Sequence, residues 1–241
     1  MATTTHLPAA APAGPPRPAA TPPQRLPWTG NDQADRLIAG DPTALLIGFL
    51  LDQQITVQKA FTGPLDIRAR LGTLDAGELA RMDPADVEAA FSRPPAIHRF
   101  PRSMAQRVQA LCSMIAGEYG GDASRVWNDA ADADDLLRRL GRLPGFGPMK
   151  ARTVLTLLVK QFGVTPAGYE QHLPDHPTLG DVTTPEELNA YQTGKRAHKA
   201  MLRAQGLAPR RPGRGLSSPH EPRTRQPTPR IPHPTPDSPR R

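Results

Sequence analysis

The chain has 241 residues, and its composition excludes several classes of protein before any motif is considered. A single cysteine, Cys112, rules out an intramolecular disulfide framework, a four-cysteine iron–sulfur cluster and a cysteine-built zinc site. Because the first 25 residues lack the unbroken apolar stretch of a secretory signal and no window is long enough to span a membrane, we expect a cytoplasmic protein with no membrane partner. We also expect a monomer without a metal or cofactor.

Proline and arginine concentrate at the two ends of the chain. Residues 1–25 and 206–241 hold 17 of the 30 prolines and few apolar residues, so we predict that both segments are disordered. They carry ten arginines and two acidic residues, so their combined net charge is more positive than the +7 of the whole chain. The central domain, residues 26–205, is therefore slightly acidic, and a nucleic-acid partner must be argued from local features.

The first half of the central domain is predicted to be helical, because its apolar residues recur at helical spacing between capping residues and glycines. Asp41-Pro42 predicts the start of a helix that buries Leu45, Leu46, Phe49 and Leu50. Thr56 is expected to cap the next helix, which we predict over residues 57–70, with Gly72 after it.

The middle of the domain continues the pattern. Asp83-Pro84 is a second Asp-Pro helix start, and the Pro94-Pro95 pair interrupts the chain. A long amphipathic helix is predicted over Pro101–Tyr119, with Cys112 on its apolar face as a buried small residue. Residues 93–103, RPPAIHRFPRS, form a positively charged segment stiffened by proline; it either touches a DNA backbone or lines a boundary between lobes, and we favour the boundary.

In the second half of the central domain, glycine and proline again separate the predicted helices. One helix is predicted from Asp132 or Asp134 to Leu140, ended by Gly141, and another over residues 148–162. Residues 164–183 lack periodicity and are predicted to be loop.

The last helix begins at a capping box, Thr184-Pro185-Glu186-Glu187, and runs toward Ala204. With no convincing pair of strands anywhere, the fold class predicted is all-α, with about nine helices.

The turn between the two helices of the second half, RLPGFGPMKA over residues 142–151, favours phosphate binding. Gly145 and Gly147 allow the backbone to turn tightly and to approach a ligand. Amides there and in the following helical turn point outward, and the helix dipole adds partial positive charge. Phe146 should point inward and brace the turn, and Lys150 would add an ionic contact. For a bare Gly-x-Gly, an ordinary helix corner is the alternative.

The full LPGFG string, followed by an alanine and an apolar helix, resembles the helix–hairpin–helix motif of the DNA glycosylase superfamily. That superfamily includes endonuclease III, the adenine-mismatch glycosylase and the alkylpurine glycosylases. A second stretch, residues 45–56 (LLIGFLLDQQIT), looks like the family's first-domain helix and its Gln-Gln-Ile-Ser/Thr turn, closest to the alkylpurine branch. The resemblance covers roughly residues 27–163, although a plain helix end is an alternative for the second stretch taken alone.

The resemblance implies a two-lobed HhH-GPD-like fold that binds damaged or abasic double-stranded DNA and acts in base excision repair. It assigns Gln54 to the gap that a flipped nucleotide leaves in the base stack, with Gln53 and Thr56 beside it. Gly145, Phe146, Gly147, Met149 and Lys150 would form the other DNA contact.

The resemblance also implies a catalytic aspartate beyond the hairpin, and here the sequence departs from the family. No aspartate-centred string occurs in residues 163–176; Glu170 lies closest to the expected place and Asp175 next. Met149 stands where some members carry the lysine used for strand cleavage, so the resemblance implies a monofunctional glycosylase. The alternatives are a non-catalytic DNA-binding protein that has lost the aspartate, and a helical protein–protein adaptor.

Overall fold

The computed structural model describes residues 22–205, and the side chains of all of these except residues 198, 199, 202 and 203. Within this range every regular element is a helix, which confirms the all-α class. Residues 22–197 form one compact unit, and residues 198–205 belong to a second. The predicted disorder of residues 1–25 and 206–241 falls, apart from residues 22–25, outside the described residues.

The described α-helices, in chain order, are α1 (Asp32–Gly40), α2 (Pro42–Leu51), α3 (Val57–Leu71), α4 (Ala76–Arg81), α5 (Pro84–Ser92), α6 (Pro101–Tyr119), α7 (Arg125–Asn128), α8 (Ala133–Arg142), α9 (Pro148–Phe162) and α10 (Pro185–Ala204). Two 3₁₀ helices, η1 (Tyr169–His172) and η2 (Leu179–Asp181), lie in the stretch predicted to be loop. None of the helices found in the described part of the chain is long and apolar enough to cross a membrane.

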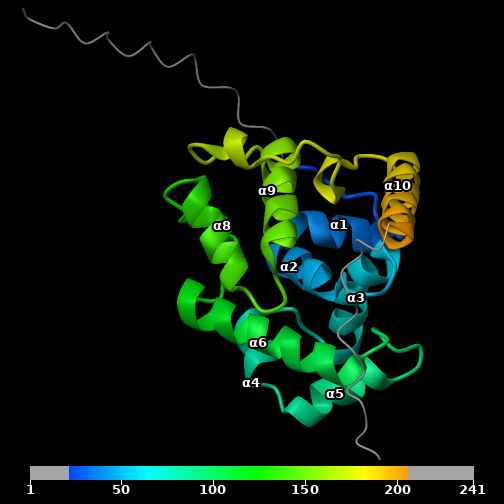
Figure 1. Ribbon diagram of the computed structural model, residues 1–241. Helices are drawn as coiled ribbons and strands as arrows, with labels where there is room; N and C mark the ends of the chain where they lie inside the picture. Colours follow the sequence, from blue (N-terminus) through cyan, green and yellow to red (C-terminus); the bar gives the residue numbers. More distant parts are fainter. Residues whose placement is uncertain (1–21, 206–241) are drawn as a thin grey trace, which may run out of the picture. The chain divides into compact units, whose positions relative to one another are not determined.

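Helix α2 is the centre of the unit that residues 22–197 form. Asp41 caps it, accepting hydrogen bonds from the amides of Thr43 (2.8 Å) and Ala44 (3.0 Å). Every residue of α2 from Thr43 to Leu51 is buried, because α1, α3 and α6 all pack against it. Figure 1 shows α2 among these helices, with α4 and α5 against α6.

Helices α2 and α3 approach each other closely at Gly48. A Cβ at this position would lie 2.4 Å from Cδ1 of Phe61, so glycine is the residue that permits the contact. Phe49, Phe61 and the fully buried Trp28 form edge-on aromatic pairs around it. The indole Nε1 of Trp28 also donates to the carbonyl of Val182 (3.1 Å), which joins the start of the unit to η2.

Helices α8 and α9 lie side by side and are joined by the turn at residues 143–147 (Figure 1). The prediction that Gly141 ends α8 was wrong, because the helix continues to Arg142, whose guanidinium bonds to Glu118 (2.9 Å). The predicted bounds of α6 and α9 are confirmed. Cys112 is buried, and burial raises the pKa of its thiol to about 12, as fits a core residue.

Candidate nucleic-acid interface

The turn between α8 and α9 presents backbone N–H groups to solvent. Gly145 has a φ of 81°, in the left-handed region that favours glycine. The Phe146 amide closes the turn by donating to Leu143 O (3.0 Å). By contrast, the amides of Gly145, Gly147 and Met149 have no hydrogen-bond acceptor among the described residues, and all three residues are exposed. Exposed donors at a helix N-terminus are an anion-binding arrangement.

Phe146 has a supporting role in this turn. Its side chain is buried in the core, as the sequence predicted, and its amide is already bonded. It therefore braces the hairpin from inside and offers no donor to a ligand. Met149, at the same corner, is 64% exposed.

The turn after α2, residues 52–56, lies directly beside the hairpin. A Cβ on Gly145 would lie 3.3 Å from Nε2 of Gln53 and 3.4 Å from Cγ of Leu50. The ammonium group of Lys150 donates a hydrogen bond to the carbonyl of Phe49, 101 residues away in the chain. The structure thus brings together the two segments that were selected by separate motifs.

Gln53 is held in place by three elements. Its Nε2 donates to Leu50 O (2.6 Å), and its Oε1 accepts from Nη1 of Arg107 on α6 (2.9 Å). Its carbonyl accepts from Nε2 of the buried His98 (2.9 Å), whose Nδ1 accepts from the amide of Phe100 (3.0 Å). This pattern requires a neutral His98 with its proton on Nε2, in accord with burial lowering its pKa.

Gln54, by contrast, is exposed and has a φ of 60°, which a residue with a side chain rarely adopts. Within residues 22–205 its side chain has no hydrogen-bond partner. Of the two glutamines, Gln53 fixes the turn and Gln54 is available for contact. Thr56 caps α3, accepting from the Lys59 amide (3.3 Å).

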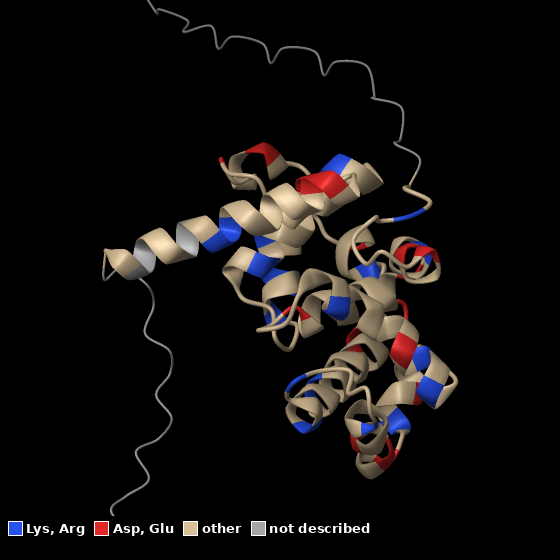
Figure 2. Ribbon diagram, turned by 90° about the vertical axis from the view of Figure 1, so that its right-hand side faces the viewer, with Lys and Arg blue, Asp and Glu red and all other residues tan. Residues whose placement is uncertain are grey.

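Positive charge gathers around the two turns although the domain as a whole is slightly acidic. Burial lowers the pKa of Lys150 to about 8; Asp52 opposes this shift, and the charges of Lys195 and Arg107 add to it. The positive charges of Lys59 and Arg99 also lower the pKa of His98. Figure 2 shows how lysines and arginines are distributed over the helices.

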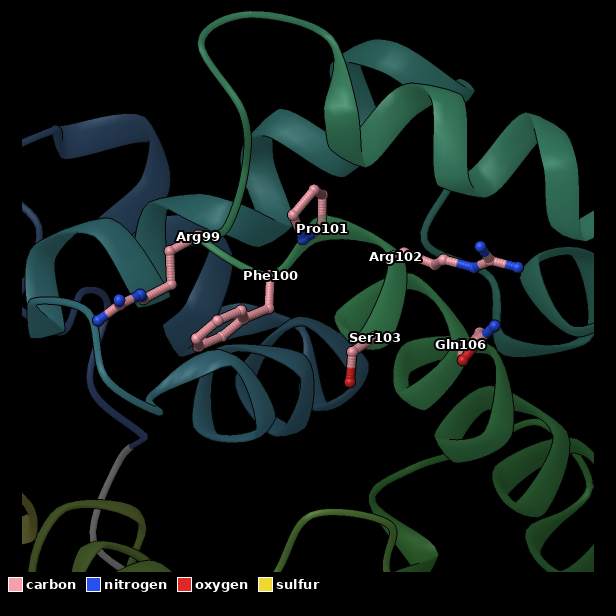
Figure 3. A pocket seen from close by; sticks show the side chains of 6 residues that line it. All are labelled: Arg99, Phe100, Pro101, Arg102, Ser103 and Gln106. Carbon is pink, nitrogen blue, oxygen red and sulfur yellow. The ribbon is translucent and has the colours of Figure 1, made fainter. Parts of the chain in front are cut away.

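The start of α6 adds a shallow pocket of about 370 Å³. Figure 3 shows the residues that line it: Arg99, Phe100, Pro101, Arg102, Ser103 and Gln106. The guanidinium of Arg99 lies 4.8 Å from the centre of the Phe100 ring, which is 41% exposed. Because Arg107 of the same helix reaches Gln53, this exposed aromatic and cationic surface belongs to the same neighbourhood.

The two carboxylates proposed as catalytic lie elsewhere. The amide of Ala133 donates to Ala167 O (3.0 Å), and His172 pairs with Asp134 (3.2 Å), so η1 and its Glu170 lie near the start of α8. The hairpin is at the other end of α8, roughly 15 Å away for a ten-residue helix. Glu170 is therefore away from the hairpin, and both Glu170 and Asp175 are exposed. Their catalytic role stays a prediction.

A different carboxylate, that of Asp52, lies near the hairpin. Asp52 is the C-terminal capping residue of α2, half-buried, with its amide bonded to Gly48 O (3.0 Å). Burial raises the pKa of this carboxyl, and the positive charges of Lys195 and Lys150 oppose the increase. Sequence analysis missed Asp52, although it stands directly before Gln53. It also gave no role to Arg107, and it placed His98 in a positive segment expected at a boundary between lobes, without its contact to Gln53.

A group of three or more His, Cys, Asp or Glu side chains able to hold a metal ion is absent from the described residues. No protein-family model, curated protein or solved structure matches the chain. The functional proposal therefore depends on the geometry of this interface and on the motifs that form it.

Proposed function

We propose that the protein binds damaged or abasic double-stranded DNA and acts as a monofunctional base-excision DNA glycosylase of the two-lobed HhH-GPD kind. The observation that carries the proposal is the proximity of two features. The unpaired amides of the Gly145–Met149 corner lie against a turn whose second glutamine, Gln54, is exposed and strained.

Each feature fits a different part of a damaged duplex. A DNA phosphate is an anion that main-chain N–H groups at a helix N-terminus can hold without a lysine. Exposed Gln54 has the size and polarity to occupy the space that an extruded nucleotide leaves. The charges of Lys59, Arg99 and Arg107 would supply the sequence-independent attraction to the backbone.

The second candidate function is a non-catalytic DNA-binding protein with the same interface. The position of Glu170, at the far end of α8 from the hairpin, favours it over a glycosylase that uses this residue.

Two measurements on the full chain distinguish these functions. The first is affinity for a duplex with a stable abasic-site analogue, compared with the undamaged duplex; a protein–protein adaptor would bind neither. The second is release of base from duplexes that carry alkylated purines. A glycosylase releases base and leaves the abasic strand intact until alkali is added, whereas the non-catalytic protein binds and releases nothing.

A further inference from the structure

Hydrolysis of an N-glycosidic bond passes through a sugar with cation character, so a carboxylate must lie where the extruded nucleotide is held. On the basis of the proposed function, that place is beside the hairpin and the Gln53–Gln54 turn. From its position there, we infer that Asp52 is the carboxylate that stabilises the sugar cation and activates the water.

The first argument is position. Asp52 directly precedes the two glutamines and ends α2, the helix whose last turn contacts the hairpin. The carbonyl of Phe49, three residues before Asp52, accepts the hydrogen bond from Lys150, and Leu50 lies against Gly145. Asp52 is therefore within one helical turn of both contacts between α2 and the hairpin.

The second argument is that the Asp52 carboxylate has no structural task. Two other aspartates that are partly or fully buried bind backbone amides, whereas Asp66 of α3 does not: Asp35 binds those of Trp28 and Thr29, and Asp41 those at the start of α2. In the part of the chain that the structure describes, no donor bonds to the carboxylate of Asp52, and none of its oxygens is a fully buried atom without a partner. The residue is half-buried, so part of its surface stays exposed to solvent.

The third argument is charge. The ionisable groups that act on Asp52 are Lys195 of α10 and Lys150 of α9, both of which favour its ionised form. Arg107 of α6 and His98 face the adjoining Gln53. A carboxylate in a partly desolvated place interacts more strongly with a developing cation than one in water does. Glu170 and Asp175 are exposed and have no such surroundings.

The proposed step is a hydrolysis. The bond between C1′ and the base nitrogen breaks, and its electron pair leaves with the base. The oxygen of a water molecule forms the new bond to C1′, and one proton of that water passes to Asp52. The proton then reaches the departed base through solvent, so the products are the free base and an abasic site, with Asp52 regenerated.

The test compares Asp52→Asn with Asp66→Asn in the full chain. Asp66 is a matched control because it too is half-buried and has no hydrogen-bond partner among the described residues, but it lies on α3 roughly 15 Å along the helix from Thr56. Single-turnover base release should fall by about a hundredfold or more in Asp52→Asn, as for loss of an electrostatic stabiliser. Affinity for the abasic duplex should stay close to that of the wild type, and Asp66→Asn should behave as the wild type in both assays.

Base release by Asp52→Asn at the wild-type rate would overturn the inference, and the variants Glu170→Gln and Asp175→Asn, assayed in parallel, would then identify the carboxylate. If the wild type releases no base from any lesion, it is the proposed glycosylase function that fails. Should Asp52→Asn fail to fold, Lys195→Gln provides a second test. Removing this positive charge raises the pKa of Asp52, so the acidic limb of the pH–rate profile should move to higher pH. An unmoved limb would contradict the role of Asp52.

Discussion

At the scale of single residues, Gly145 and Gln54 hold the two unusual backbone conformations of the interface, but they affect the protein differently. Gly145 adopts its positive φ without strain, whereas Gln54 adopts a similar φ at a cost of about 1 kcal/mol. Strained residues concentrate at functional sites, which agrees with a contact role for Gln54.

Substitution of Gly145 by valine should weaken binding to the abasic duplex by about tenfold or more. Valine is strained at a φ of 81°, and its Cβ would press on Gln53 and Leu50. Fluorescence anisotropy with a labelled duplex measures the change. Gly141→Ala is the control, since a Cβ at Gly141 meets nothing within 4 Å. Unchanged affinity in a folded Gly145→Val protein would remove the hairpin from the interface.

Substitution of Gln54 by glycine should change stability and binding in opposite directions. Relief of the positive φ should raise the free energy of unfolding by up to about 1 kcal/mol, while loss of the side chain should weaken binding to the abasic duplex. Urea denaturation and anisotropy measure the two effects. A glycine variant that binds as tightly as the wild type would show that Gln54 contacts no DNA.

At the scale of elements, caps and glycines could be predicted from the sequence because they act within a few residues. The start of α2 at Asp41-Pro42, the bounds of α6 and the capping box of α10, where Thr184 and Glu187 bond reciprocally, are all local features. The short helices α4 and α7 were missed, since so few residues carry little periodicity. The end predicted for α8 at Gly141 was wrong, since the helix continues to Arg142.

The candidate site also combines residues that local sequence patterns predict with contacts that only the folded chain creates. Gly145, Gln53 and Gln54 belong to short strings that are visible in the sequence. The contacts of Arg107 with Gln53 and of Lys150 with Phe49 exist only because α2, α6 and α9 converge, and no local pattern indicates that convergence.

The contact of Lys150 with α2 should make stability depend on pH. The pKa of Lys150 falls from 10.5 to about 8 on folding, so between these values the unfolded chain holds more protons. The free energy of unfolding contributed by this group therefore rises as pH increases from 8 to 10.5. Urea denaturation at several pH values should show this slope in the wild type and lose it in Lys150→Met. Lys59→Met, which removes an exposed lysine, is the control; parallel curves for the wild type and Lys150→Met would contradict the prediction.

At the scale of the whole molecule, charge is divided between a slightly acidic central domain and arginine-rich end segments, so in the proposed DNA complex the two parts would contribute differently. The interface supplies geometry, and residues 206–241 hold eight of the 30 Lys and Arg residues.

Deletion of residues 206–241 should therefore leave the central domain folded and flatten the salt dependence of DNA binding. The slope of log K against log salt follows the number of phosphates neutralised, so it should become less negative by roughly 0.9 for each lost phosphate contact. Titration of the duplex at several salt concentrations measures the slope, and the melting temperature checks the fold. A large fall in melting temperature would show that this segment belongs to the domain core.

The buried position of Trp28 makes its fluorescence a probe of the fold. Its indole is fully buried against Phe49 and Phe61 and bonds to Val182, whereas the chain's other tryptophan, Trp127, lies on α7. In a Trp127→Phe protein, emission would come from Trp28 alone. The emission wavelength would then report whether the segment before α10 is still packed against Trp28 while the protein is heated or titrated with a ligand.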